Sequence, residues 1–409
     1  MRPLLSVALI MAVLSCTAEV PTPGAAARFE EVAPPTEGGS GEPYLSSTED
    51  GVYLSWLERR GEGRHALRVA RLDVDGWDGA VTVAEGDDFF VNWADFPSVV
   101  TGGDGKLWAH WLQRVEGAGL AYAVRVASSA DGGATWSEPW TPHEDGTPTE
   151  HGFVSLFPWQ GGIGMTWLDG RQYAAGPDGS EATREMTVRF RHAGPETGPG
   201  PEVLLDPRAC DCCQTDVAVT DDGAVMVYRN RTEDEVRDIY AARWEDGAWL
   251  EGRPVHDDGW VIGGCPVNGP GADARGQDVV VAWFTGAGDV PRVNVAFSSD
   301  GGRSFATPIQ VDGGNPAGRV DVRLRDDGSA LLTWLERTDG DAAELRVARI
   351  EAGAGVTGEW VVARSSSARA SGFPRMTLVP GEPSAALVAW TDVSDAQNPR
   401  VRIMRMELP

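Results

Sequence analysis

A tryptophan-centred segment recurs along this chain and constrains the fold more than any other feature. It reads Leu-Ser-Trp-Leu-Glu-Arg around Trp56 and Leu-Thr-Trp-Leu-Glu-Arg around Trp334. Related segments, with successive aromatics 51 to 61 residues apart, are centred on Trp111, Trp167, Tyr228, Trp283 and Trp390. A repeat of roughly 40–50 residues built from short strands is typical of a β-propeller. The seven copies therefore predict an all-β, seven-bladed β-propeller.

Each repeat has the alternation and the Gly and Asp turns expected of four short antiparallel strands. The seventh repeat has only three such segments, at residues 375–379, 385–391 and 401–408. Residues 28–32 form a strand-like segment without a blade of its own. Because a closed ring leaves no exposed strand edge, we expect this N-terminal strand to complete the seventh blade. Residues 28–409 are thus predicted to form one propeller domain, and we expect a monomer.

The N-terminus has the pattern of an export signal. Arg2 precedes a short apolar run, which ends in Val-Leu-Ser-Cys at Cys16. This ending resembles the lipobox of bacterial lipoproteins, which implies that residues 1–16 are a signal peptide and that Cys16 is lipidated. Residues 17–27 read as a flexible tether. The resemblance implies an exported, membrane-anchored protein of the cell envelope; the alternative is an ordinary signal peptide with an incidental cysteine.

The charge balance excludes one class of partner. The chain has 35 Lys and Arg against 61 Asp and Glu, a formal net charge of −26. Nucleic acids and anionic lipid surfaces need a basic protein face. We therefore expect no nucleic-acid partner, and membrane association only through the lipid anchor.

Two turns carry a more specific motif. Ser-Ala-Asp-Gly-Gly-Ala-Thr-Trp contains Asp131, and Ser-Ser-Asp-Gly-Gly-Arg-Ser-Phe contains Asp300. Both resemble the Asp-box of sialidases and BNR-repeat proteins. The resemblance implies that both aspartates are structural and lie on the face opposite the ligand site.

The same family resemblance does not extend to catalytic residues. Sialidases have six blades, an Arg-Ile-Pro-type segment and an arginine triad, and the seven repeats and missing segment depart from that pattern. No catalytic residue is assigned. An exo-glycosidase of this kind would need paired carboxylates facing the central funnel, and the candidate acids are Asp95, Asp169 and Glu233.

A cysteine cluster is the densest chemical signal. Cys210, Cys212 and Cys213 precede the first strand of the fourth repeat, and Cys265 precedes that of the fifth. Equivalent loops on adjacent blades should bring all four to one rim of the funnel. Three interpretations stay open: disulfides, as in many exported proteins; a Cu or Zn site made of thiolates; and a redox-active pair.

Charged residues are predicted on the same rim from equivalent loop positions. They suggest an anionic or glycan ligand, because arginine recognises carboxylates through two parallel hydrogen bonds. The favoured interpretation is a binding propeller, with a sialidase-like hydrolase and a thiolate metal or redox protein as alternatives. The predicted funnel residues are Asp95, His151, Asp169, Arg171, Arg229, Arg231, Arg319 and Arg375.

Overall fold

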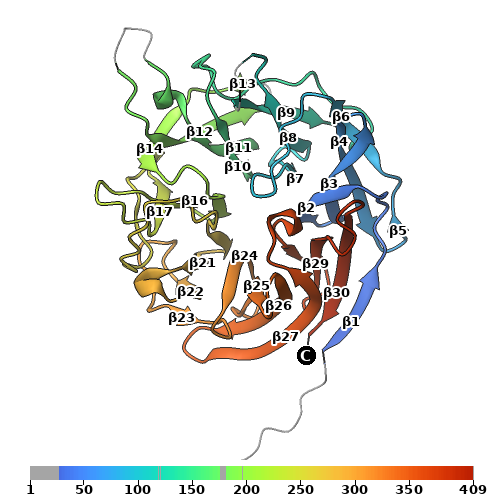
Figure 1. Ribbon diagram of the computed structural model, residues 1–409, viewed down its shortest axis with the longest axis vertical. Helices are drawn as coiled ribbons and strands as arrows, with labels where there is room; N and C mark the ends of the chain where they lie inside the picture. The colour runs from blue at the N-terminus through green and yellow to red at the C-terminus, as the bar shows by residue number, and fades with distance from the viewer. Residues whose placement is uncertain (1–26, 118, 120, 176–180, 196, 409) are drawn as a thin grey trace, which may run out of the picture.

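The computed structural model describes residues 27–408 except 118, 120, 176–180 and 196. Seven antiparallel sheets stand around a central axis like the blades of a propeller (Figure 1). The seven-bladed prediction is confirmed. The predicted signal peptide, Cys16 and nearly all of the predicted tether lie outside the described residues. Among the described residues, no helix is long and apolar enough to cross a membrane.

Each blade begins with its innermost strand and continues outward. Blade 1 contains β2 (Ser40–Thr48), β3 (Gly51–Gly61), β4 (Arg64–Asp73), β5 (Gly76–Trp77) and β6 (Val81–Gly86). Blade 2 contains β7 (Ser98–Thr101), β8 (Leu107–Arg114) and β9 (Tyr122–Ser129). Blade 3 contains β10 (His151–Trp159), β11 (Gly162–Asp169), β12 (Met186–Gly194), β13 (Gly198–Pro199) and β14 (Val203–Ala209).

The remaining blades follow the same order. Blade 4 contains β15 (Asp216–Val219), β16 (Ala224–Arg229), β17 (Ile239–Glu245), β18 (Ala248–Trp249) and β19 (Arg253–Pro254). Blade 5 contains β20 (Gly271–Arg275), β21 (Asp278–Thr285), β22 (Arg292–Ser298) and β23 (Ile309–Gln310). Blade 6 contains β24 (Pro316–Leu324), β25 (Ala330–Arg337), β26 (Ala342–Glu351) and β27 (Gly355–Ser366).

The seventh blade joins the two ends of the described chain. It contains β28 (Arg375–Leu378), β29 (Ala385–Asp392) and β30 (Arg400–Glu407), and its outer strand is β1 (Arg28–Val32). β1 pairs antiparallel with β30 along its whole length, and the two strands lie side by side in Figure 1. The predicted closure by the N-terminal strand is confirmed.

Blade 2 departs from the predicted four strands. Its fourth position holds an isolated bridge, in which the backbones of Val126 and Trp140 exchange hydrogen bonds of 2.8 and 2.9 Å. The intervening turn is the first Asp-box, which contains Asp131. Helical structure in the described residues is limited to three short 3-10 turns, η1 (Arg171–Tyr173), η2 (Ala287–Asp289) and η3 (Arg369–Ser371).

The repeated aromatics explain how the blades hold together. The seven aromatics are at most 6% exposed, and each belongs to a separate apolar cluster shared by two adjacent blades. Trp56, for example, clusters with Leu387 and Ala389 of blade 7. Its indole N–H donates to Glu58 Oε2 at 3.1 Å, which satisfies the buried nitrogen.

Carboxylates fasten the innermost strands to one another. In four places an aspartate at or just before an innermost strand accepts a backbone N–H from the innermost strand of the next blade, at 2.7–3.0 Å. These pairs are Asp95 with Phe153, Asp216 with Ala272, Asp273 with Leu324 and Asp321 with Met376.

Both Asp-box turns are held by internal hydrogen bonds. Asp131 Oδ1 accepts from Ser129 Oγ at 2.8 Å and from the Thr135 N–H at 2.9 Å. Asp300 accepts from Ser298 and Ser304 in the same way. Hydrogen bonds from Thr135 and Ser129 lower the pKa of Asp131 to about 2. The contacts agree with a structural role, whereas membership of the BNR-repeat family stays a prediction.

Removal of residues 28–32 should destabilise the protein, because β30 would lose its partner. The exposed edge of β30 could then pair with a strand of another molecule. We expect a lower melting temperature and concentration-dependent self-association, measured by calorimetry and light scattering. The control is a protein that lacks residues 1–27 but keeps residues 28–32. Equal melting temperatures for the two shortened proteins would contradict closure by β1.

Candidate functional site

Two loops bring the four cysteines together. Cys210, Cys212 and Cys213 lie between β14 and β15, and Cys265 lies between β19 and β20. Each loop runs from the outside of one blade to the innermost strand of the next, so both open on the same face of the ring. We call this face the funnel face. The Asp-box turns follow the third strands β9 and β22 and lie at the opposite end of their blades.

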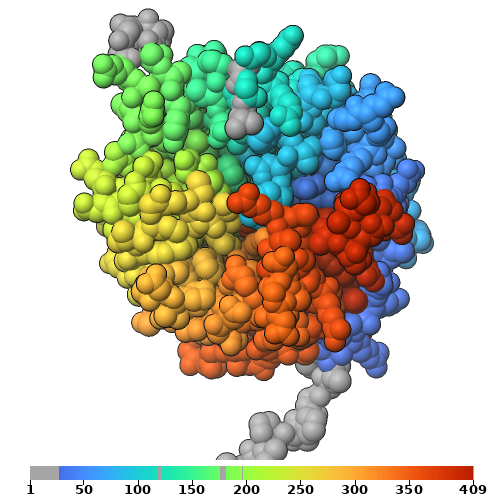
Figure 2. All heavy atoms as spheres, viewed as in Figure 1, coloured from blue at the N-terminus to red at the C-terminus, as the bar shows by residue number. Residues whose placement is uncertain are grey.

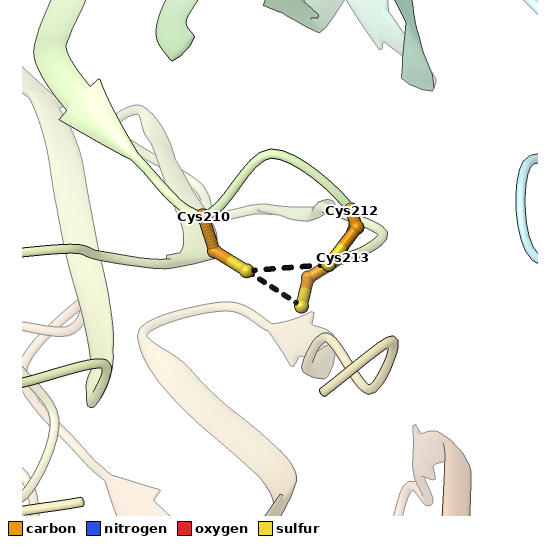
Figure 3. A group of neighbouring side chains, drawn as sticks. All are labelled: Cys210, Cys212 and Cys213. Atoms are coloured by element: carbon orange, nitrogen blue, oxygen red, sulfur yellow. Dashed lines mark hydrogen bonds between the residues drawn. The ribbon is translucent and has the colours of Figure 1, made fainter. Parts of the chain in front are cut away.

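Three of the cysteines form a compact group, which we call the inner trio: Cys210, Cys212 and Cys213. The Sγ of Cys210 lies 3.1 Å from that of Cys213 and 3.7 Å from that of Cys212, and the sulfurs converge in Figure 3. Cys210 and Cys213 are 1% and 2% exposed, and Cys212 is half-buried. All four cysteines are free, so the disulfide alternative is not formed in this structure.

Two guanidinium groups lie beside the inner trio. Arg237 Nη1 donates to Cys210 Sγ at 3.4 Å. Hydrogen bonds from Cys212 and Cys213 hold the pKa of the Cys210 thiol well below its usual value, and the charge of Arg229 lowers it further. Burial raises the pKa of Cys213. The trio therefore favours one thiolate, on Cys210, stabilised by two neighbouring thiols and two cations.

A second group overlaps the first and lies nearer the solvent. The ligand atoms of Asp211, Cys212 and Cys265 lie within 4.8 Å of one another. Cys265 is exposed, and its Sγ contacts Asp211 Oδ1 at 3.6 Å. We call these three residues the outer group. Cys212 belongs to both groups.

An open pocket adjoins the outer group. It has a volume of about 430 Å³ and is lined by Ala121, Pro148, Thr149, Glu150, Tyr173, Met186 and Asp211. Tyr173 donates to Asp211 Oδ2 at 3.2 Å. Burial and the charge of Asp211 raise the pKa of Tyr173 to about 12 and also raise that of Glu150. The pocket is therefore acidic and offers no lysine or arginine to an anion.

The centre of the ring is filled. Tyr44, Asp95, Phe153, Asp216 and Arg375, from different blades, surround a cavity of only about 10 Å³. In space-filling view the loops crowd toward the axis (Figure 2). A ligand on this face would therefore bind at the rim and not along the axis.

The predicted funnel arginines are occupied by the protein itself. Arg229 donates to the carbonyls of Arg237, Asn268 and Phe284 at 2.6–3.0 Å. Arg319 donates to the carbonyls of Ser367, Ala368 and Gly372 and to Ser371 Oγ, at 2.7–3.1 Å. Burial and the charge of Arg337 lower the pKa of Arg319 to about 10. These two side chains stabilise loops.

The other three arginines are paired with carboxylates. Arg171 contacts Asp169 and Glu202 at 2.7 and 2.8 Å. The partners of Arg231 are Glu235 and Glu185, at 2.7 and 3.6 Å. Arg375 lies 3.4 Å from Asp321 and over the ring of Tyr44. Each of these guanidinium groups thus has an internal partner in this structure, and the anion-binding rim stays a prediction.

His151 belongs to a buried charge network on blade 3. Its ring stacks on His143 at 3.7 Å, and both rings contact Asp145. Burial opposes ionisation of Asp145, but hydrogen bonds to both imidazoles hold its pKa below the usual value. Arg171 also lies 3.5 Å from Asp145. The ligand atoms of His143, Asp145 and His151 lie within 4.8 Å of one another, so this network is a further group that is close enough to hold a metal ion.

The candidate acids do not form a free carboxylate pair. Asp169 accepts from Trp167 and Arg171 at 2.7–2.8 Å and is fully buried. Asp95 is 3% exposed and accepts from Phe153 and Tyr122. Glu233 is exposed in the loop after β16. Asp95 and Asp169 thus already have internal partners, whereas Glu233 is open to solvent.

Several site residues were absent from the sequence predictions. Asp211 stands between two predicted cysteines and could have been included for that reason. Arg237, Glu150 and Tyr173 carry no comparable signal, because each comes from a different loop and reaches the site only through the folded ring. His143 gave a weak signal through its spacing to His151.

Asp95→Asn should change how stability depends on pH. Burial raises the pKa of the Asp95 carboxyl from 3.8 to about 7. The folded protein thus holds a proton that the unfolded chain releases, and stability falls as pH rises between about 4 and 7. The amide of Asn does not titrate, so the free energy of unfolding of the variant should not fall in this way. Between about pH 4 and pH 7, its stability relative to wild type should therefore rise by roughly 2–4 kcal/mol. Urea unfolding at several pH values measures it. A pH-independent difference between the two proteins would refute the assignment.

The comparisons with known proteins establish the fold. No protein-family model matches the chain, and no curated protein sequence matches it. A protein of unknown function from Dyadobacter fermentans is 14% identical, with a TM-score of 0.51 over 94% of this chain and 99% of its own. The lectin BP39L from Burkholderia pseudomallei is 16% identical, with a TM-score of 0.58 over 89% and 95%. A looser match, with a TM-score of 0.48 and 9% identity over 93% and 94%, is the sialidase NanB from Streptococcus pneumoniae.

Proposed function

We propose that this protein binds one Cu(I) ion through the inner trio on the funnel face. The observation that carries the proposal is the convergence of three sulfurs at 3.1–3.7 Å from a four-residue stretch. Soft thiolate ligands without nitrogen or oxygen favour Cu(I). A structural Zn(II) site would need a fourth tetrahedral ligand beside the inner trio, and the remaining thiol, Cys265, is exposed and lies with Asp211 and Cys212 in the outer group.

The local charges fit a monovalent ion. Three thiolates around one Cu(I) leave two negative charges. Arg229 and Arg237 lie beside them, and Arg237 shares its charge with Glu235 at 2.8 Å. Arg237 contacts Cys210 directly, and Arg229 is held in place by three carbonyl groups. Both cations are already fixed before the ion arrives, so binding requires little rearrangement.

The predicted location outside the cytoplasm would explain why the cysteines bind a metal ion. If Cys16 is lipidated, the propeller lies outside the cytoplasm, where unprotected neighbouring thiols oxidise. A bound soft ion keeps thiolates reduced by occupying their lone pairs. Anchoring and export remain predictions from the N-terminal sequence.

Cu(I) titration of the reduced protein under anaerobic conditions, against a competing chelator, should give one tightly bound ion. Cys210→Ser and Cys213→Ser should each weaken binding by more than the roughly 10–100-fold typical of second-shell changes. Asp222→Asn, in an exposed turn at the far end of blade 4, is the control. Melting curves verify folding. Protein purified without reductant would overturn the proposal if it contained neither free thiols nor bound metal. This result would mean that the cysteines form disulfides.

The pocket supports a second candidate, a neutral glycan. Tyr173 and the carboxylates of Glu150 and Asp211 combine an aromatic face with hydrogen-bond acceptors in about 430 Å³, which suits a hydroxyl-rich ligand. Sialylated ligands would meet repulsion from the same acids. Titration calorimetry should then detect neutral oligosaccharides, with binding lost in Tyr173→Ala. Preferential binding of sialylated oligosaccharides would contradict this candidate.

A further inference from the structure

The two groups of candidate ligands overlap at one sulfur. Cys212 is within 4.8 Å of Cys210 and Cys213 in the inner trio and of Asp211 and Cys265 in the outer group. Four of these ligands, Cys210, Asp211, Cys212 and Cys213, come from the loop that enters blade 4, and Cys265 comes from the loop that enters blade 5. An ion held in either group would therefore be bound by Cys212.

Exposure increases steadily from one group to the other. Cys210 and Cys213 are buried, Cys212 and Asp211 are half-buried, and Cys265 is exposed. Asp211 also lines the open pocket. An ion coming from solvent reaches the outer group first, because the buried sulfurs lie behind it.

The loop that carries Cys265 is open to an approaching partner. Gly263 and Gly264 precede Cys265, and a Cβ added at either position would meet no atom within 4 Å. This part of the chain is therefore not packed against the blade. A small Cu(I) complex has room to approach Cys265 from this side.

We propose that Asp211, Cys212 and Cys265 form an outer transfer site, through which Cu(I) enters and leaves the inner trio. The proposal rests on Cu(I) binding by the inner trio and adds the route of exchange. A site with one oxygen and two sulfurs, partly in water, holds Cu(I) less firmly than three sulfurs do. The ion thus passes from the weaker site to the stronger one.

The transfer is a ligand exchange without change of oxidation state. The bond from Cu(I) to Cys212 Sγ is kept. The bonds to Cys265 Sγ and Asp211 break, and bonds to Cys210 Sγ and Cys213 Sγ form. The proton of the Cys213 thiol passes through water to the released Cys265 thiolate. Arg237 faces both positions, with Nη1 at 3.4 Å from Cys210 Sγ and 3.7 Å from Asp211 Oδ1.

The test separates rate from affinity. Cu(I) is supplied as a complex with a coloured chelator, and its transfer to the reduced full-length protein is followed by stopped-flow absorbance. In Cys265→Ser and Asp211→Asn, transfer in both directions should slow by about tenfold or more. The binding constant and the one-ion stoichiometry should stay near those of wild type, because an exchange site changes both rates equally. Asp222→Asn should behave as wild type.

Each other result overturns the inference. Unchanged rates in both variants would exclude an exchange role for the outer group. A loss of affinity equal to that of Cys210→Ser would make Cys265 an ordinary ligand of the bound ion. If wild-type protein binds no Cu(I) in the equilibrium titration, the proposed function itself fails, and this is seen before any variant is measured.

Discussion

The packing of one aromatic side chain between each pair of adjacent blades is the interaction on which the rest of the structure depends. A single four-stranded blade cannot bury its two faces alone, so each blade is stable only against its neighbours. Trp56, buried against blade 7, closes the ring, since it joins the first repeat to the last. The pairing of β1 with β30 covers the edge left at that junction. Stability is therefore a property of the closed ring.

The closure of the ring of blades also restricts where a ligand or metal ion could bind. The innermost strands approach so closely that aspartates of one blade accept backbone N–H groups of the next, and the axis is filled by side chains such as Tyr44 and Arg375. The proposed sites therefore lie at the rim, where the loops that enter blades 4 and 5 open. The cysteines and the acidic pocket lie together there. The Asp-box turns lie at the opposite end of their blades.

The charges at this rim support the proposal of a cationic ligand over an anionic one. The arginines predicted at the funnel bind groups of the protein itself. Arg319, for example, donates hydrogen bonds to main-chain carbonyls, and Arg171 forms an ion pair with a carboxylate. Burying a guanidinium requires such partners, and these internal contacts stabilise the loops that carry the arginines. Around the inner trio, Arg229 and Arg237 adjoin thiols that would gain negative charge if the proposed soft metal displaced their protons, and Arg237 also pairs with Glu235.

The sequence by itself determined the repeat, the blade count, the closing strand and the nearness of the two cysteine loops, because each follows from periodicity along the chain. Equivalent positions in a repeat occupy equivalent positions in the ring, so Cys265 and Cys213 could be placed on one face without coordinates. Only the tertiary structure decided which side chains are free. The partners of Arg229, and the meeting of Tyr173 with Asp211, join loops distant in sequence, and no local pattern encodes such contacts.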